Sequence, residues 1–247
     1  MVALGASNLT RGFHTVVATA RAAWGPGVRV LAALGHGRSY GARSLFLFRS
    51  LPGILDSGIW RELESRPKDR TRALVTDVGN DILYAFPAER VLAWVEEAVA
   101  RLLRHTDDIV LTGLPMDSIR RLPPAKFLAF RSVLVPSCRL SLERVIETSE
   151  KVDAGLEALA AARGIRFFRL DPEWYGFDPI HIRPSLWRPA WRRILGCEGA
   201  GAGEGSPLRE ALKLYLLPPE RRRVLGVERF RPQRGVPLPS GARVWLY

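Results

Sequence analysis

The chain has 247 residues, of which 47% are hydrophobic, 9% aromatic and 25% charged. This length and composition suit one large folded domain with a buried core, and they exclude a disordered chain. The formal net charge is +12, from 37 basic and 25 acidic residues. A basic balance allows binding to a polyanion, but charge alone indicates neither a fold nor a reaction.

The chain has two cysteines, Cys138 and Cys197. They are too few for a disulfide framework and are not spaced as metal ligands, so we expect reduced thiols and neither a metal nor another cofactor. The apolar start at 1–4 is too short for a signal-peptide core, and no apolar run approaches the ~20 residues of a membrane span. We therefore expect a cytoplasmic protein without a membrane span.

Short apolar runs bounded by turn residues predict buried strands, and in chain order these are 2–4, 28–34, 73–78, 109–112 and 165–170. Helical spacing of apolar residues predicts helices at 13–24, 87–103 and 142–162. Alternating strands and helices imply right-handed crossovers. The predicted fold class is α/β: a doubly wound, flavodoxin-like, five-stranded parallel sheet in three α/β/α layers.

The C-terminal part of the chain differs in composition. Residues 196–207 are rich in glycine and predict a flexible linker, and an arginine- and proline-rich stretch follows. The last residues, 242–247, alternate like an edge strand. We place the main domain at 1–197 and the linker with a basic extension at 198–247.

A serine follows the first predicted strand, in the sequence Gly5-Ala6-Ser7-Asn8. It would lie at the carboxyl end of the strand, where ligands of such sheets bind, and close to a helix N-terminus that favours negative charge. The alternative is an ordinary turn or N-cap serine.

Two further polar turns follow the second and third strands. The first is the glycine-rich stretch 35–41, whose amide groups could bind an oxyanion but which lacks the Lys-Ser or Lys-Thr pair of a phosphate loop. The second is Gly79-Asn80-Asp81, whose asparagine amide could donate to the same oxyanion. Either stretch alone also fits a simple turn.

Asp178 and His181 follow the last predicted strand, three positions apart. A histidine is the usual proton acceptor for a serine hydroxyl, and a carboxylate orients it. A surface loop histidine or half of a metal site would look the same, although no second cluster of His or Cys supports a metal. The four polar elements together fall at one edge of the sheet, which a set of unrelated turns does not predict.

The order of these motifs resembles the SGNH (GDSL-type) hydrolase superfamily over residues 2 to about 195. The resemblance implies Ser7 as nucleophile and His181 as general base, oriented by Asp178. It also implies an oxyanion hole from the Ser7 amide, the Gly37 amide and the Asn80 side chain.

Gly35 and Gly41 are the alternatives to Gly37 in the oxyanion hole. The chain also departs from the usual family pattern, with Ala6 where the family has aspartate before the serine, Asn8 where it has leucine, and Val78 where it has glycine. These departures leave each proton-transfer and oxyanion role filled.

Several aromatic residues lie close to these motifs. His14 and His36 could line the site, or could be structural. Trp174, Tyr175 and Phe177 could shape the acyl or alcohol pocket, or could cover the sheet edge.

The sequence thus leads to two hypotheses. The first is a serine ester hydrolase that forms an acyl-enzyme on a small or carbohydrate-linked acyl ester, with no nucleic-acid partner. The alternative is a non-catalytic basic protein of the same fold that binds a polyanion. Neither the acyl and alcohol parts of the substrate nor the oligomeric state follow from the sequence.

Overall fold

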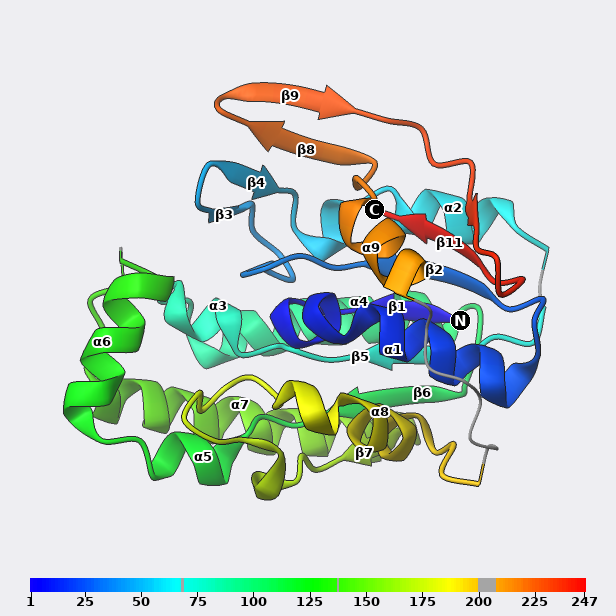
Figure 1. Cartoon of the computed structure of the whole chain (residues 1–247). Coiled ribbons are helices and arrows are strands. Elements are labelled where there is room, and N and C mark those ends of the chain that lie inside the picture. The colour runs from blue at the N-terminus through cyan, green and yellow to red at the C-terminus, as the bar shows by residue number, and fades with distance from the viewer. Residues whose placement is uncertain (68, 137, 200–207) are drawn as a thin grey trace.

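The computed structural model describes residues 1–67, 69–136, 138–199 and 208–247, except for the side chains of helix residues 133 and 134. Most of the predicted linker at 196–207 therefore lies outside the described residues. Within them, a central sheet lies between two layers of helices, and a second, smaller sheet stands beside it (Figure 1).

The central sheet has seven strands in the described part of the chain. From edge to edge they are β10 (Val236–Pro237), β11 (Arg243–Leu246), β2 (Arg29–Ala33), β1 (Val2–Leu4), β5 (Ala73–Val75), β6 (Ile109–Thr112) and β7 (Arg166–Phe168). All neighbours are parallel except β10 and β11. The order β2-β1-β5-β6-β7 is the flavodoxin order, which confirms the predicted α/β fold class. The sheet is larger than the predicted five strands, because the C-terminal β11 and β10 extend it beyond β2. Its switch point, where ligands of such sheets bind, lies between β1 and β5.

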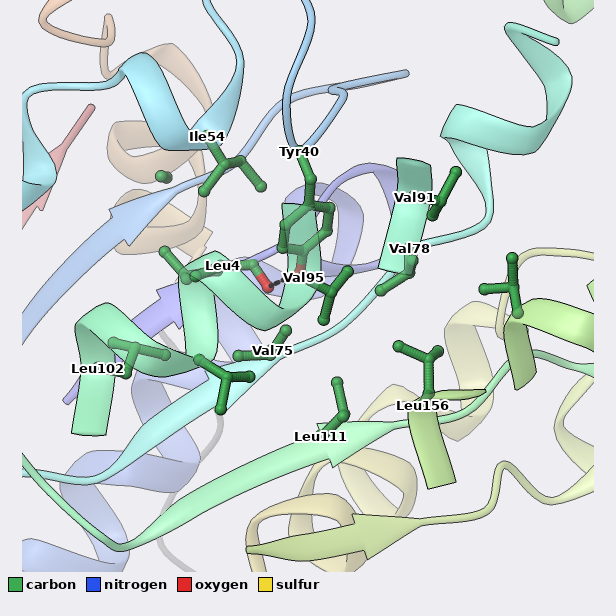
Figure 2. Close-up of a cluster of buried hydrophobic side chains, with 14 of the residues drawn as sticks. Leu4, Tyr40, Ile54, Val75, Val78, Val91, Val95, Leu102, Leu111 and Leu156 are labelled. Atoms are coloured by element: carbon green, nitrogen blue, oxygen red, sulfur yellow. Dashed lines mark hydrogen bonds between the residues drawn. The ribbon is translucent and has the colours of Figure 1, made fainter. Parts of the chain in front are cut away.

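Helices cover both faces of this sheet, so its strands are buried on both sides. On one face lie α2 (Ile59–Ser65), α4 (Ala88–Leu103) and α7 (Leu142–Arg163), and on the other lie α1 (Ser7–Trp24), α8 (Trp187–Leu195) and α9 (Leu208–Leu216). Figure 2 shows strand residues Leu4, Val75 and Leu111 in one apolar cluster with Val95 and Leu102 of α4.

Three short helices follow β5 and β6 at the carboxyl ends of the strands. They are α3 (Asn80–Leu83), α5 (Met116–Arg120) and α6 (Pro124–Leu134), and none of the three was predicted. None of the helices in the described residues is long and apolar enough to cross a membrane.

Capping residues mark both ends of the long helix α7. Ser141 caps α7 by accepting a hydrogen bond from the Arg144 amide, and Gly164 ends it with a left-handed φ of 62°. The first helix is longer than predicted, because α1 begins at Ser7 rather than at residue 13. Ser7 is therefore the first residue of the helix, directly at its positive end.

The C-terminal part of the chain joins both sheets. The strand predicted at the edge forms as β11, but the edge position was wrong: β11 lies between β2 and the two-residue β10, and Val244, Trp245 and Leu246 are all buried. The smaller antiparallel sheet was not predicted; its strands are β3 (Ser44–Phe46), β4 (Arg49–Leu51), β8 (Arg221–Val224) and β9 (Val227–Phe230).

Candidate active site

The turn between β1 and α1 is held by a carboxylate from the neighbouring strand. Asp77 follows β5, and its Oδ2 accepts hydrogen bonds from the Ala6 and Leu9 amides, both at 2.9 Å. The N-cap residue of α1 is Ala6, which has no side chain able to accept these bonds. Asp77 therefore supplies from a distance the cap that the helix lacks, and this fixes the position of Ser7 at the switch point of the sheet.

Asp77 itself has a left-handed backbone, with φ of 61°. This conformation is uncommon for a residue with a Cβ, although aspartate tolerates it better than most. It ends β5 at Val75, three residues before the predicted end of that strand. The turn directs the Asp77 carboxylate towards α1 rather than towards solvent.

Asn8 connects three parts of the site, a role that the sequence analysis did not predict. Its Nδ2 donates to Asp77 Oδ1 at 3.0 Å and to the Ile180 carbonyl oxygen at 2.8 Å. Its Oδ1 accepts from the Ile182 amide at 2.8 Å. One side chain therefore fixes the loop that carries His181 against the turn that carries Ser7.

Ser7, His181 and Asp178 form one continuous chain of hydrogen bonds. Ser7 Oγ and His181 Nε2 are 2.9 Å apart, and His181 Nδ1 and Asp178 Oδ2 are 2.7 Å apart. With Nδ1 protonated and donating to the carboxylate, Nε2 has a free lone pair for the serine proton; this tautomer follows from the partners. The side chain of His181 is only 10% exposed, which protects the arrangement from water.

Asp178 is kept ionised by its partners. Its Oδ1 accepts from the amides of Ile180 and His181, each at 3.2 Å. Partial burial acts to raise the pKa of Asp178, but the His181 imidazole and these amides outweigh it and lower the pKa below its usual value. The carboxylate is thus available to hold the imidazole and to stabilise it when it becomes charged.

The glycine turn after β2 is fixed by a tyrosine that follows α3. Gly37 has a φ of 63°, and its carbonyl oxygen accepts from Tyr84 Oη at 2.5 Å. Burial raises the pKa of Tyr84 to about 12, so its hydroxyl stays protonated and donates. Asn80 begins the same helix α3, and its Nδ2 lies 3.4 Å from the Asp77 carbonyl oxygen. Gly37 and Asn80 are therefore both anchored to one short helix.

The two alternative glycines face other parts of the molecule. A Cβ on Gly35 would meet Leu51 Cδ1 at 2.3 Å, and a Cβ on Gly41 would meet the Trp94 ring of α4 at 2.0 Å. These glycines serve close packing of the turn. Buried Arg38 supports the turn from below by donating to the carbonyl oxygens of Leu34, Pro52 and Tyr247.

The aromatic residues and histidines near the motifs differ in burial and in location. Trp174 and Tyr175 are buried in the core, whereas Phe177 is 82% exposed. His36 stacks on Phe46 with ring centroids 5.2 Å apart, and both His14 and His36 line a second cavity beyond the first turn of α1. Burial, followed by the charge of Arg49, lowers the pKa of His36 to about 4, so that its imidazole is neutral at pH 7.

A cavity of about 110 Å³ opens beside Ser7 and Asn80. It lies at the carboxyl ends of β5 and β6, and its walls are mostly apolar. In the described residues no group of three or more His, Cys, Asp or Glu side chains could hold a metal ion. The polar chemistry at this edge of the sheet is that of a serine, a histidine, a carboxylate and amide donors.

No protein-family model matches the sequence, and no curated protein matches it. Solved structures of similar fold include a carbohydrate acetylesterase family member from Sinorhizobium meliloti, at 16% identity and a TM-score of 0.51, with 79% of this chain and 98% of that one covered. A carbohydrate acetylesterase from the same organism is 14% identical with a TM-score of 0.55, over 81% of this chain and 98% of that one. At these identities the likeness shows a shared fold.

Proposed function

We propose that the chain is a serine hydrolase of ester bonds, of the SGNH type, with Ser7 as nucleophile and His181 as general base. The observation that carries the proposal is the continuous hydrogen-bonded chain from Ser7 Oγ through His181 to Asp178. The nucleophile lies at a helix N-terminus and at the switch point of the sheet, which is where a doubly wound fold binds its ligand.

The reaction follows from this geometry. Ser7 Oγ attacks the ester carbonyl carbon while His181 Nε2 takes the serine proton, and Asp178 stabilises the resulting imidazolium. The bond to the alcohol oxygen then breaks, and His181 gives its proton to that oxygen. Water, deprotonated by His181, attacks the acyl-enzyme, so that the carboxylic acid leaves and Ser7 regains its proton.

The negative oxygen of the tetrahedral intermediate needs donors that are already in place. We assign this role to the Ser7 amide, the Gly37 amide and Asn80 Nδ2, each donor of this kind being worth about 3 kcal/mol in the transition state. The positions of Gly37 and Asn80 support the assignment, because Tyr84 and α3 hold both of them next to the switch point. The folds of the two acetylesterases support the same class of reaction by analogy.

Steady-state hydrolysis of p-nitrophenyl acetate and butyrate tests the proposal. Ser7→Ala should lower kcat/KM by more than about 10³-fold, because no other group replaces the nucleophile. Ser65→Ala, at an exposed serine of α2, is the matched control and should keep wild-type activity. Wild-type turnover by a folded Ser7→Ala protein would exclude Ser7 as the nucleophile.

A further inference from the structure

The cavity beside Ser7 is lined both by residues of the candidate site and by a part of the chain that the proposed reaction does not use. Residues of α5, α6 and the start of α7 contribute to its walls, and α5 and α6 lie at the same end of the sheet as α3 (Figure 1). Its apolar walls include Leu83, Leu114, Ile119, Phe127, Leu142 and Val145. The segment between β6 and α7 thus contributes apolar walls to a cavity that the candidate site itself borders.

The charged groups that border this cavity already have partners. The Asp77 carboxylate is used by the Ala6 and Leu9 amides and by Asn8. Arg131 donates to the Leu140 carbonyl oxygen at 2.8 Å. Both charged groups are thus engaged with the protein, and the rest of the lining is mostly apolar, so the walls favour an apolar occupant.

The cavity lies on the acyl side of the reacting bond. The leaving alcohol oxygen must receive its proton from His181 Nε2, so the alcohol part departs next to that imidazole. The described lining of the cavity includes Ser7 and Asn80; the loop of His181 contributes Pro179 and Ile180 to it, but the imidazole itself is not part of the lining. A chain that enters the cavity is thus attached to the carbonyl carbon on the side away from the leaving oxygen.

The size of the cavity determines how much of this chain it can enclose. An apolar cavity of about 150 Å³ is known to hold a benzene molecule of about six carbons. The cavity beside Ser7 has about 110 Å³. It accommodates about four carbons beyond the carbonyl group on the same scale.

Resting on the proposed function, we infer that this protein is selective for esters of unbranched apolar acyl groups of about four to six carbons, which the cavity beside Ser7 binds. Phe130 of α6 lines the cavity, and its ring centroid is 5.9 Å from that of exposed Phe177. The acetyl group, in contrast, leaves the apolar walls without contacts.

The first test is a series of p-nitrophenyl esters from acetate to dodecanoate, with kcat/KM as the readout. Each methylene that enters the cavity should raise kcat/KM by up to about fourfold. We expect the maximum between butyrate and hexanoate and a decline from octanoate onwards. A maximum at acetate, or a profile that keeps rising to dodecanoate, would overturn the inference.

Variants that narrow or widen the cavity distinguish a change in chain-length selectivity from a general loss of activity. Val145→Phe narrows the cavity and should shift the maximum to shorter chains. Phe130→Ala removes a ring from its lining and should shift the maximum to longer chains. Leu128→Ala, at an exposed leucine of the same α6, should leave the maximum where it is. If Val145→Phe does not fold, Val145→Leu adds one carbon and should give a smaller shift in the same direction. Absence of opposite shifts in folded variants would contradict the inference.

This experiment distinguishes the inference from the proposed function. Turnover of acetate that depends on Ser7, without the predicted chain-length maximum, would contradict the inference and leave the esterase intact. No turnover of any ester by the folded wild type would contradict both.

Discussion

Asn8 Nδ2 donates a hydrogen bond to Asp77 Oδ1 over 3.0 Å, and this bond joins the first turn of α1 to the turn that follows β5. Because Asn8 also bonds to the loop at Ile180 and Ile182, it sets the distance between Ser7 and His181. It is a positioning residue.

Replacement of Asn8 should therefore affect the chemical step. We expect Asn8→Ala to lower kcat about 10- to 100-fold with little change in KM, since a small displacement of a catalytic group costs this much. Steady-state kinetics on a variant with an unchanged circular dichroism spectrum measures it. A change confined to KM, or none at all, would show that Asn8 does not position the base.

The Gly37 turn leads to a second prediction. A Cβ at position 37 would lie 2.7 Å from Tyr84 Oη. The substituted residue would also have to adopt the left-handed φ of 63° that Gly37 has. Gly37→Ala should thus lower kcat by about 10²-fold through displacement of an oxyanion donor. Tyr84→Phe removes only the hydrogen bond and should have a smaller effect. Equal activity of Gly37→Ala and wild type would exclude Gly37 from the oxyanion hole.

Asp178 gives a third prediction, because its carboxylate fixes the imidazole tautomer. Asp178→Asn should lower kcat about 10³- to 10⁴-fold, since the amide favours the tautomer that donates towards Ser7. The interaction between Asp178 and His181 also depends on pH. Because the pKa of Asp178 is lowered in the folded protein, its contribution to stability is present above its unfolded pKa and is lost as the pH falls through its folded value. Full activity of Asp178→Asn would show that another group orients His181.

Asp81 allows a prediction about stability. It is buried behind the glycine turn, where its Oδ2 accepts from the Tyr40 amide at 2.9 Å. Burial, partly offset by bonds from Ser39 and Tyr40, raises the pKa of Asp81 from 3.8 to about 6. The folded state therefore binds the proton more tightly than the unfolded state, and stability from this group is lost as the pH rises from about 4 through about 6.

The neutral, equally sized Asp81→Asn variant should not show this loss. The free energy of unfolding of the variant minus that of the wild type should rise by on the order of 2 kcal/mol from pH 4 to pH 7. Urea unfolding at the two pH values measures the difference, with Asp117→Asn at an exposed aspartate of α5 as control. A difference between variant and wild type that is the same at both pH values would contradict it.

The main features of the fold could be predicted because its strands are continuous apolar runs. The helices with strong apolar spacing, α4 and α7, were also found close to their observed bounds. The first turn of α1 was missed because serine, asparagine and glycine are poor helix formers, and its cap comes from Asp77, 68 residues from Leu9.

The smaller sheet could not be predicted from local signals. The turn between β3 and β4 contains Leu47 with a φ of 56°, where a hairpin normally has glycine or asparagine. Strand β8 is Arg221 to Val224, which has no apolar alternation. The pairing of β4 with β8 joins segments that are far apart in the sequence.

The candidate site was predicted residue by residue where motifs exist, and the structure brings Ser7, His181 and Asp178 together. Asn8 and Asp77 were not identified, because an asparagine after a serine and an aspartate after a strand become meaningful only through partners such as Ile180, 172 residues away from Asn8.

Whether Ser7 is an activated nucleophile can be measured by intact-mass analysis after reaction with a fluorophosphonate probe. We expect one adduct on the wild type, none on Ser7→Ala, and much slower labelling of His181→Ala, because the serine then lacks its base. An unlabelled, properly folded wild type, or a Ser7→Ala variant that is labelled as fast as the wild type, would contradict it.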